Sequence, residues 1–261
     1  MSDDELEETR RFWNDIAHDW DIQVGAEGDD NRRLNSDPVL WRMVGDVAGL
    51  AVLDAGCGTG YLSRKLHDSG ARVVGIDFSE RMIAIARGIA PYIDFRVESV
   101  SRLASIASES IDLVVSNYVL MDTPLLHDTL QAFHRVLKPL GTAVTVFSHP
   151  CFPQGRADTL EQGRGVRYSW ESSYFEQRKC SDPPWGHFSS SFIWFHRPLS
   201  DYWKAFTASG LDVVEFEEPH VSAERQALAK DRSIQSGFLE RPYSVAFKLR
   251  RRAEGSARKP L

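Results

Sequence analysis

The segment Val52-Leu53-Asp54-Ala55-Gly56-Cys57-Gly58-Thr59-Gly60 ends an apolar run with three glycines at alternate positions. Glycine permits a tight turn and lets the backbone approach a ligand closely, with the amides of a following helix exposed behind it. The third glycine of a dinucleotide-binding G-x-G-x-x-G fingerprint would fall at position 61, which is Tyr61. The segment therefore predicts a strand, a ligand-binding glycine loop and a helix, and it disfavours NAD.

Short apolar runs alternate with amphipathic stretches from residue 50 to 147, which is typical of a parallel sheet covered by helices. Apolar residues recur at helical spacing between the runs. Gly70 is expected to stop the first helix and Ser79 to cap the second. The expected strands are 50–55, 72–76, 93–97, 111–116 and 142–147.

The rest of the chain predicts an insert, one more helix and two closing strands. Residues 148–197 are irregular and rich in aromatic side chains, and 198–210 have a helical pattern that ends at Gly210. Residues 211–219 and 243–250 are expected to be strands, and an antiparallel final pair is compatible with a mixed sheet.

The chain has 261 residues, 42% of them hydrophobic, which is enough for one α/β core with attachments. We divide it into an N-terminal helical cap (1–48), a main domain (49–249) with a substrate-lid insert (149–197), and a basic flexible tail (250–261). A polar helix over 3–20 has too few apolar residues to fold alone, so it must lie on the rest of the protein.

Charge and cysteine content disfavour several classes of protein. The net charge of −6 gives no electrostatic reason to bind nucleic acid phosphates or an anionic membrane. No run of about 18 apolar residues and no signal-peptide pattern is present, so we expect a cytoplasmic protein. The three cysteines include no close pair, which predicts reduced thiols and no metal site.

Asp77 stands at the end of the strand that follows the glycine loop. A carboxylate at this position is well placed to accept hydrogen bonds from two ribose hydroxyls, as in other nucleotide-binding α/β folds. Asp77 by itself would be an ordinary residue at a strand end, but its register relative to the glycine loop favours ligand binding.

VLDAGCGTG (52–60) followed by VVGIDFS (73–79) resembles motifs I and II of the class I S-adenosyl-L-methionine (SAM)-dependent methyltransferases. Further segments resemble a bacterial small-molecule branch of that superfamily, and the resemblance runs from about residue 11 to 249. These segments are IDLVVSNYVLMD (111–122), RVLKP (135–139), FSHPCF (147–152) and HRPLSDYWKAFTASGL (196–211).

The resemblance implies an α/β fold with a doubly wound, mostly parallel seven-stranded sheet in the order 3-2-1-4-5-7-6. It also implies an N-terminal helical lid and the aromatic-rich insert after strand 5. The cofactor would be SAM, with the glycine loop around its methionine part, Asp77 on its ribose and Phe78 beside its adenine. The cofactor-binding residues expected on this basis are Trp13, Asp54, Gly56, Gly58, Gly60, Asp77, Phe78, Met82, Ser99, Val100 and Asn117.

One position departs from the family pattern in a way that affects adenine binding. The family often has an aspartate after the third strand, whereas this chain has Ser99, a weaker and neutral acceptor. Backbone amides near Val100 could still contribute. The N-terminal helix would fold over the cofactor through Phe12 or Trp13, although plain packing of an amphipathic helix explains Trp13 equally well.

Ligands of open α/β sheets bind beyond the carboxyl ends of the strands, so the loops after strands four and five should face the transferred methyl. Those loops hold the candidate catalytic residues Tyr118, Asp122 and His149. An acceptor must lose a proton, and His149 or Asp122 could take it. His149 is equally well explained as an ordinary loop histidine, so the use of a general base stays open.

The insert contains two features that invite functional interpretation. Its aromatic residues suit a pocket for an apolar or sugar-bearing acceptor, and a small satellite core or a dimer contact explains them equally well. Asp182-Pro183-Pro184-Trp185 spells the tetrapeptide of adenine-N6 methyltransferases. In those enzymes it closes the fourth strand, so we expect only a loop turn here.

The sequence therefore predicts an enzyme that moves the methyl group of SAM to a nitrogen or oxygen of a small metabolite, with secondary metabolism as one setting. Nitrogen is slightly favoured because no obvious strong base is visible. A nucleic-acid base methyltransferase and a non-catalytic SAM-binding regulatory module are the alternatives. The expected partner is a small-molecule acceptor, without nucleic acid or membrane, and a homo-oligomer stays open.

Overall fold

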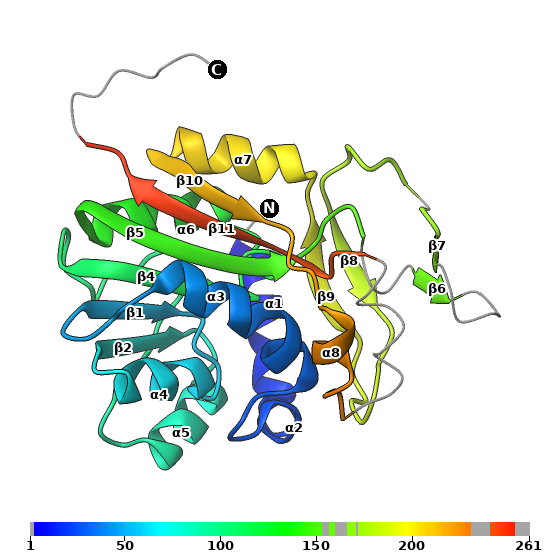
Figure 1. Cartoon of the computed structure of the whole chain (residues 1–261), viewed down its shortest axis with the longest axis horizontal. Coiled ribbons are helices and arrows are strands. Elements are labelled where there is room, and N and C mark those ends of the chain that lie inside the picture. Colours follow the sequence, from blue (N-terminus) through cyan, green and yellow to red (C-terminus); the bar gives the residue numbers. More distant parts are fainter. Residues whose placement is uncertain (1–2, 153–156, 160–165, 171, 231–240, 254–261) are drawn as a thin grey trace.

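The computed structural model describes residues 3–152, 157–159, 166–170, 172–230 and 241–253. A seven-stranded sheet with the order β10-β11-β5-β4-β1-β2-β3 forms its centre (Figure 1). When the seven strands are numbered one to seven along the chain and read from the β3 edge of the sheet, their order is 3-2-1-4-5-7-6. This order confirms the expected topology. The strands are β1 (Ala51–Ala55), β2 (Arg72–Asp77), β3 (Asp94–Val97), β4 (Ile111–Asn117), β5 (Leu137–Ser148), β10 (Leu211–Glu217) and β11 (Ser244–Arg251).

Strand direction in the sheet follows the predicted mixed pattern. The pairs β1–β2, β2–β3, β1–β4 and β4–β5 are parallel. Strand β11 runs antiparallel to both β5 and β10, so β10 points the same way as β5. The carboxyl ends of the parallel strands therefore lie along one edge of the sheet, where the glycine loop follows β1.

Alternating strand residues build a separate core on each face of the sheet. Val52 and Val115 pack on one face, with apolar residues of α3 (Asp37–Val44), α4 (Tyr61–Asp68) and α5 (Glu80–Ile89). Leu53 and Val114 pack on the other, with residues of α6 (Leu126–Val136) and α7 (Leu199–Ala208). Figure 1 shows the helices flanking the sheet in this way.

Two of the predicted helix boundaries are confirmed by local hydrogen bonds. Helix α4 ends at Asp68, and Gly70 follows with a φ of +87° while its N–H donates to the carbonyl of His67. Ser79 caps α5, because its Oγ accepts from the N–H of Met82 at 3.1 Å. A polar N-cap of this kind satisfies one of the donors that a helix start leaves unpaired.

The N-terminal cap is more broken than the expected single helix over 3–20. It contains α1 (Asp3–Asp15), α2 (Ala17–Val24) and the π-helical turn η1 (Arg32–Ser36) before α3. The break falls at Ile16, which is buried with Phe12 and Phe188 in a small cluster. Burial of this apolar contact explains why the cap rests on the insert.

The insert is more regular than the sequence suggests. Strands β8 (Arg178–Asp182) and β9 (Phe192–His196) form an antiparallel pair, and short β6 (Ala157–Thr159) pairs with β7 (Val166–Tyr168). The aromatic and β-branched residues of β9 favour a strand once a partner is present. Parts of the insert, at 153–156, 160–165 and 171, lie outside the described residues.

Strand β11 extends to Arg251, past the expected start of the basic tail at residue 250. The guanidinium of Arg251 is buried and donates to the carbonyl of Leu137 at 2.6 Å. The tail from 254 to 261 lies outside the described residues. Within the described part of the chain, a short helix α8 (Ala223–Gln226) completes the set, and no helix has the length and apolar character needed to cross a membrane.

Candidate cofactor and acceptor site

The glycine loop after β1 takes a shape that side chains would obstruct. Gly56 has a φ of +81°, and a Cβ there would lie 2.3 Å from Cγ2 of Val119. The N–H of Gly56 donates to the carbonyl of Ile76 at 2.8 Å, which ties the loop to β2. Gly58 also has a positive φ, of +53°. Glycine is therefore required for the conformation as well as for close approach of a ligand.

Asp77 is fixed by the loops on both sides of it. Its Oδ2 accepts from the N–H of Gly58 at 3.0 Å, and its Oδ1 accepts from the N–H of Ser79 at 2.9 Å. Burial raises the pKa of Asp77 to about 6, although the two backbone hydrogen bonds favour the charged form. Each carboxylate oxygen can accept a further hydrogen bond, so the group can still take two ribose hydroxyls.

Asp54 links β1 to the helix behind the loop. Its Oδ2 accepts from the Ser63 hydroxyl at 2.6 Å. Burial raises the pKa of Asp54 to about 7, and the nearby charge of Asp77 acts in the same direction. Two carboxylates are thus held in one buried loop region, where a cationic ligand would stabilise their charged forms.

A first cavity, with about 900 Å³ of space that includes solvent-open volume, collects nearly all the predicted cofactor residues. Gly60 does not line it. A Cβ at Gly60 would lie 2.8 Å from Cζ of Phe95, so this glycine allows close packing behind the loop. The predicted residues that line the first cavity are Trp13, Asp54, Gly56, Gly58, Asp77, Phe78, Met82, Ser99, Val100, Asn117, Tyr118 and Asp122.

A second cavity adjoins the first and has about 1640 Å³ of space, which also includes volume open to solvent. Strands β8 and β9 of the insert supply part of its wall, including Asp182, Phe192 and Trp194. We call the residues that border both cavities the junction; they are Trp13, Trp20, Arg32, Tyr118 and Asp122. A group that passes from a ligand in one cavity to a ligand in the other must cross at the junction.

Aromatic and cationic side chains of the cap form one side of the junction. The rings of Trp13 and Trp20 meet edge to face with centroids 5.0 Å apart. The Arg32 guanidinium lies 5.1 Å from the centroid of the Trp20 ring, and it donates to Asp29 at 2.9 Å. Stacking and the ion pair together fix Trp20 at the boundary between the two cavities.

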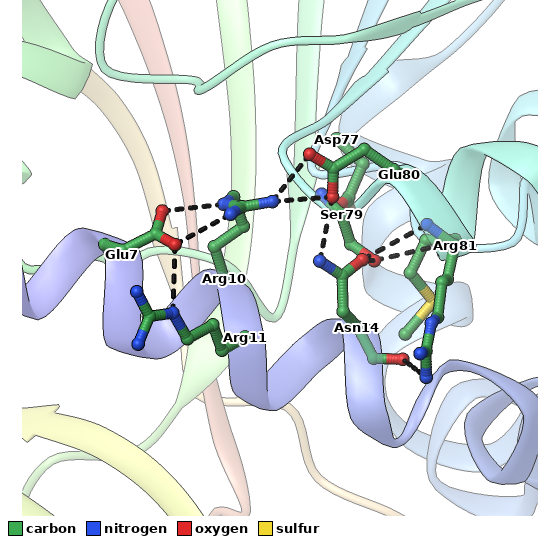
Figure 2. A network of polar contacts seen from close by, with 9 residues as sticks. Glu7, Arg10, Arg11, Asn14, Asp77, Ser79, Glu80 and Arg81 are labelled. Atoms are coloured by element: carbon green, nitrogen blue, oxygen red, sulfur yellow. Dashed lines mark hydrogen bonds and ion pairs between the residues drawn. The ribbon is translucent and has the colours of Figure 1, made fainter.

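A polar network, which we call the lid latch, holds α1 against the start of α5 (Figure 2). Asn14 Oδ1 accepts from the Ser79 hydroxyl at 2.7 Å and from the N–H of Arg81 at 3.1 Å. Asn14 Nδ2 donates to Glu80 at 2.8 Å, and Arg10 donates to both oxygens of Glu80 at 2.6 and 2.7 Å. Helix α1, which carries Trp13, is therefore anchored at Ser79, two residues after Asp77.

Tyr118 has its hydroxyl fully engaged. The hydroxyl donates to Asn31 Oδ1 at 2.9 Å and accepts from Asn35 Nδ2 at 3.1 Å. Burial raises the pKa of Tyr118 to about 12, so the phenol stays protonated at neutral pH. The contacts suit a residue that fixes the start of the π-helical turn η1 beside the junction.

His149 lines the second cavity with both ring nitrogens occupied. Nδ1 accepts from the N–H of Cys151 at 3.1 Å, so the proton sits on Nε2, which donates to Glu218 at 2.7 Å. Burial lowers the pKa of His149, while Glu218 opposes that shift. In this arrangement neither ring nitrogen has a lone pair available to take a proton from an acceptor.

Asp122 differs from the other two catalytic candidates because its carboxylate receives no hydrogen bond from the residues that the structure describes. The side chain is half-buried and borders both cavities. Burial, together with the negative charge of Asp182, raises the pKa of Asp122 well above its ordinary value. A carboxylate with a raised pKa is a stronger proton acceptor than an ordinary aspartate.

Arg197 holds the loop that carries Asp122. The buried guanidinium donates to the carbonyls of Thr123 at 2.7 Å and Pro124 at 3.1 Å. It also reaches the carbonyl of Leu120 at 3.4 Å. The loop after β4 is thus fixed by a side chain that follows β9, in a segment more than seventy residues away.

Sequence reasoning missed several residues of the second cavity. The tetrapeptide that begins at Asp182 was expected to be only a loop turn. Residues 183–185 do lie in a loop, whereas Asp182 is the last residue of β8, half-buried and part of the cavity wall. Asn31 and Arg32 belong to no motif, and Arg197 lies in the family-like segment 196–211 without any feature that marks it as a residue of the cavity.

Residues 53–145 match a family described as a methyltransferase domain. The chain is 32% identical over 156 residues to the demethylmenaquinone methyltransferase of Lactococcus lactis subsp. lactis, covering 56% of this chain and 61% of that protein. It is 33% identical over 144 residues to the ubiquinone biosynthesis O-methyltransferase of Hahella chejuensis, covering 52% and 58%. The chain thus spans about 60% of the length of these curated relatives.

A solved structure shows the same fold over most of the chain. The S-adenosylmethionine-dependent methyltransferase from Mesorhizobium loti superposes with a TM-score of 0.71 at 23% identity, covering 87% of this chain and 100% of that one. The structural match therefore covers much more of the chain than the family segment 53–145.

Proposed function

We propose that this chain is a class I SAM-dependent methyltransferase that transfers the methyl group of SAM to a nitrogen or oxygen of a small metabolite. The observation that carries this proposal is the pair of adjoining cavities with a shared junction. The first cavity has the residues to hold the cofactor, and the second has room and aromatic walls for an acceptor.

Three features of the first cavity fit SAM. The Gly56–Gly58 turn lets a ligand approach the backbone, and Asp77 can accept from the ribose hydroxyls. Oδ1 of Asn117 is buried without a partner among the residues that the structure describes, so a ligand donor can satisfy it. Phe78 and Met82 offer apolar surface for an adenine.

SAM, when bound, supplies a methyl group on a positively charged sulfur that an acceptor displaces in line. The residues of the junction provide for this in three ways. Trp13 and Trp20 cover the boundary and exclude water. Tyr118 fixes the geometry of η1, and Asp122 takes the proton that the acceptor loses.

A small acceptor is favoured over a nucleic acid. The second cavity is walled by β8 and β9 and by residues of the cap, so its opening suits a small molecule. The chain has a net charge of −6, whereas polymer binding normally depends on several basic residues that neutralise phosphates. The relatives' names, demethylmenaquinone and ubiquinone biosynthesis methyltransferases, also refer to small molecules.

A transfer assay with SAM labelled on its methyl group tests the proposal. The protein is incubated with a bacterial metabolite extract, with DNA and with RNA, at low and moderate salt. We expect label in small molecules only, and about a hundredfold loss or more in Asp122→Asn because a proton acceptor is removed. The matched control is Asp128→Asn, an exposed residue of α6, which should keep full activity. Salt-sensitive label in nucleic acid would contradict the proposal.

A further inference from the structure

The charged side chains of the second cavity make its lining negative. Four aspartates and two arginines border it: Asp29, Asp30, Asp122, Asp182, Arg32 and Arg197. Asp29 pairs with Arg32 at 2.9 Å, and Asp30 pairs with Arg33, which stands outside the lining. The Arg197 guanidinium donates to backbone carbonyls of the loop after β4. The cavity therefore has an excess of carboxylates over guanidinium groups.

Asp122 brings this negative charge to the junction, and Asp182 acts on it from the wall of the second cavity. They come from the loop after β4 and from the end of β8, and they are close enough for the charge of Asp182 to act on Asp122. The half-buried Asp122 borders both cavities, and its carboxylate receives no hydrogen bond from the described residues. Two carboxylates that repel each other in a low-dielectric site stabilise a cation between or beside them.

Aromatic surface adjoins the two carboxylates. Trp185 and Phe192 stack with their ring centroids 5.3 Å apart, and Trp194 lies on the same strand as Phe192. All three line the second cavity with Asp182. Aromatic faces attract cations as well as apolar groups, so this wall suits a ligand with an apolar body and a positive end.

We propose that the methyl acceptor is an amine that is protonated in solution, held by the Asp122–Asp182 pair with its apolar body on Trp185, Phe192 and Trp194. This inference rests on the proposed methyltransferase function and specifies its acceptor. Neutral alcohols and carboxylic acids lack the charge that the pair selects. The site discriminates between them by electrostatic complementarity rather than by size.

The chemistry balances with groups already present. The ammonium gives a proton to the Asp122 carboxylate, which frees the nitrogen lone pair. A nitrogen–carbon bond forms with that pair, and the sulfur–carbon bond breaks with its electrons staying on sulfur. The product is an N-methylammonium and a neutral thioether, and the proton on Asp122 leaves to solvent.

Binding of matched ligands tests the inference without requiring turnover. The probes are 1-naphthylmethylamine, 1-naphthylmethanol and 1-naphthoic acid, which share one ring system, titrated calorimetrically into protein saturated with S-adenosylhomocysteine. We expect the amine to bind at least about tenfold more tightly than the alcohol, and the acid to bind most weakly. Asp182→Asn and Asp122→Asn should each remove about tenfold of that preference while alcohol binding stays the same. Asp128→Asn should keep the full preference.

Equal binding of amine and alcohol, or a preference that survives both substitutions, would overturn the inference. The asparagine replacements keep side-chain shape, and thermal melting of each variant checks that it is folded. Binding of S-adenosylhomocysteine, the first step of the experiment, distinguishes a failure of the proposed methyltransferase function from a failure of the acceptor assignment. If S-adenosylhomocysteine does not bind, the proposed function itself fails; if it binds and the amine preference is absent, only the acceptor assignment fails.

Discussion

Asn14 of α1 and Ser79 at the start of α5 are 65 positions apart, yet Asn14 Oδ1 accepts a hydrogen bond from Ser79 Oγ at 2.7 Å. Ser79 also caps α5 through Met82, and its N–H donates to Asp77 at 2.9 Å. One residue thus connects the lid helix, the helix cap and the carboxylate assigned to the ribose. Movement of α1 and ligand binding at Asp77 should therefore be coupled.

Loosening the lid latch should weaken cofactor binding. Asn14→Ala removes the bonds to Ser79, Glu80 and the N–H of Arg81 while leaving the apolar contacts of α1 in place. We expect about tenfold weaker binding of S-adenosylhomocysteine by calorimetry. Arg11→Ala is the control, because Arg11 is exposed on the same helix and bonds only to Glu7 among the described residues. Equal affinities for both variants would show that the latch does not support the site.

Asp77 should contribute strongly to cofactor affinity. Asp77→Ala removes an acceptor that is already held by the N–H groups of Gly58 and Ser79 and therefore needs no reordering to bind. We expect a loss of about 2 kcal/mol or more in SAM binding, measured by calorimetry. Asp94→Ala, at an exposed aspartate of β3, serves as the control. Unchanged SAM affinity in Asp77→Ala would remove the ribose assignment.

A methyl group added to the glycine loop should damage the site. Gly56→Ala places a Cβ in a backbone conformation with a φ of +81° and 2.3 Å from Cγ2 of Val119. Valine is stiff about χ1, so the loop must shift and SAM affinity should fall by about tenfold or more.

The double variant Gly56→Ala/Val119→Ala separates the two causes of that loss. It relieves the clash with the Val119 side chain and keeps the backbone strain, so we expect partial recovery of SAM affinity. Val119→Ala alone gives the reference. Gly56→Ala with normal affinity would contradict the geometry assigned to the loop.

The pH dependence of stability should report on Asp54. Burial raises its pKa to about 7 in the folded chain, above the ordinary value of about 4 expected for an unfolded chain. The folded chain gains stability because Asp54 binds its proton more tightly than in the unfolded chain. This contribution is complete below about pH 4 and is lost as pH rises through about 7. The urea midpoint of the cofactor-free protein should therefore be lower at about pH 8 than at about pH 5.5.

Asp54→Asn should reduce this fall in the urea midpoint, because the amide does not titrate. Comparison with the unaltered protein isolates the contribution of Asp54. Burial also raises the pKa values of Asp77 and Asp122, and it lowers those of His149 and His196, which change stability in the opposite direction. Asp128→Asn, on the surface, should retain the full wild-type decrease. A decrease in Asp54→Asn as large as that of the unaltered protein would show that Asp54 is ionised in the folded state throughout this range.

The sheet and most of the lining of the first cavity could be predicted because their signals are local. The glycine loop, Asp77 and Ser79 lie within one β-loop-α-β-α stretch, and each has a residue type that its backbone position demands. Gly60 shows the limit of that approach, since a motif glycine can serve packing against Phe95 instead of the ligand.

Much of the polar lining of the second cavity could not be predicted, because it is assembled from distant segments. Arg32 comes from η1, Asp182 from β8 and Arg197 from the residue after β9. Their proximity depends on how the insert packs on the cap, which no short spacing encodes. The polar residues of β8 also give no strand pattern in the sequence, because this strand is defined by its pairing with β9.

A crystal structure of the protein with SAM would show whether the two cavities have the proposed roles. We expect ribose hydroxyls on the carboxylate of Asp77 and adenine between Phe78 and the Ser99–Val100 segment. We expect the methyl group at the junction, in contact with Asp122 or Trp20 and pointing into the second cavity. SAM bound with its methyl group directed away from the second cavity, or bound elsewhere on the protein, would rule out these roles.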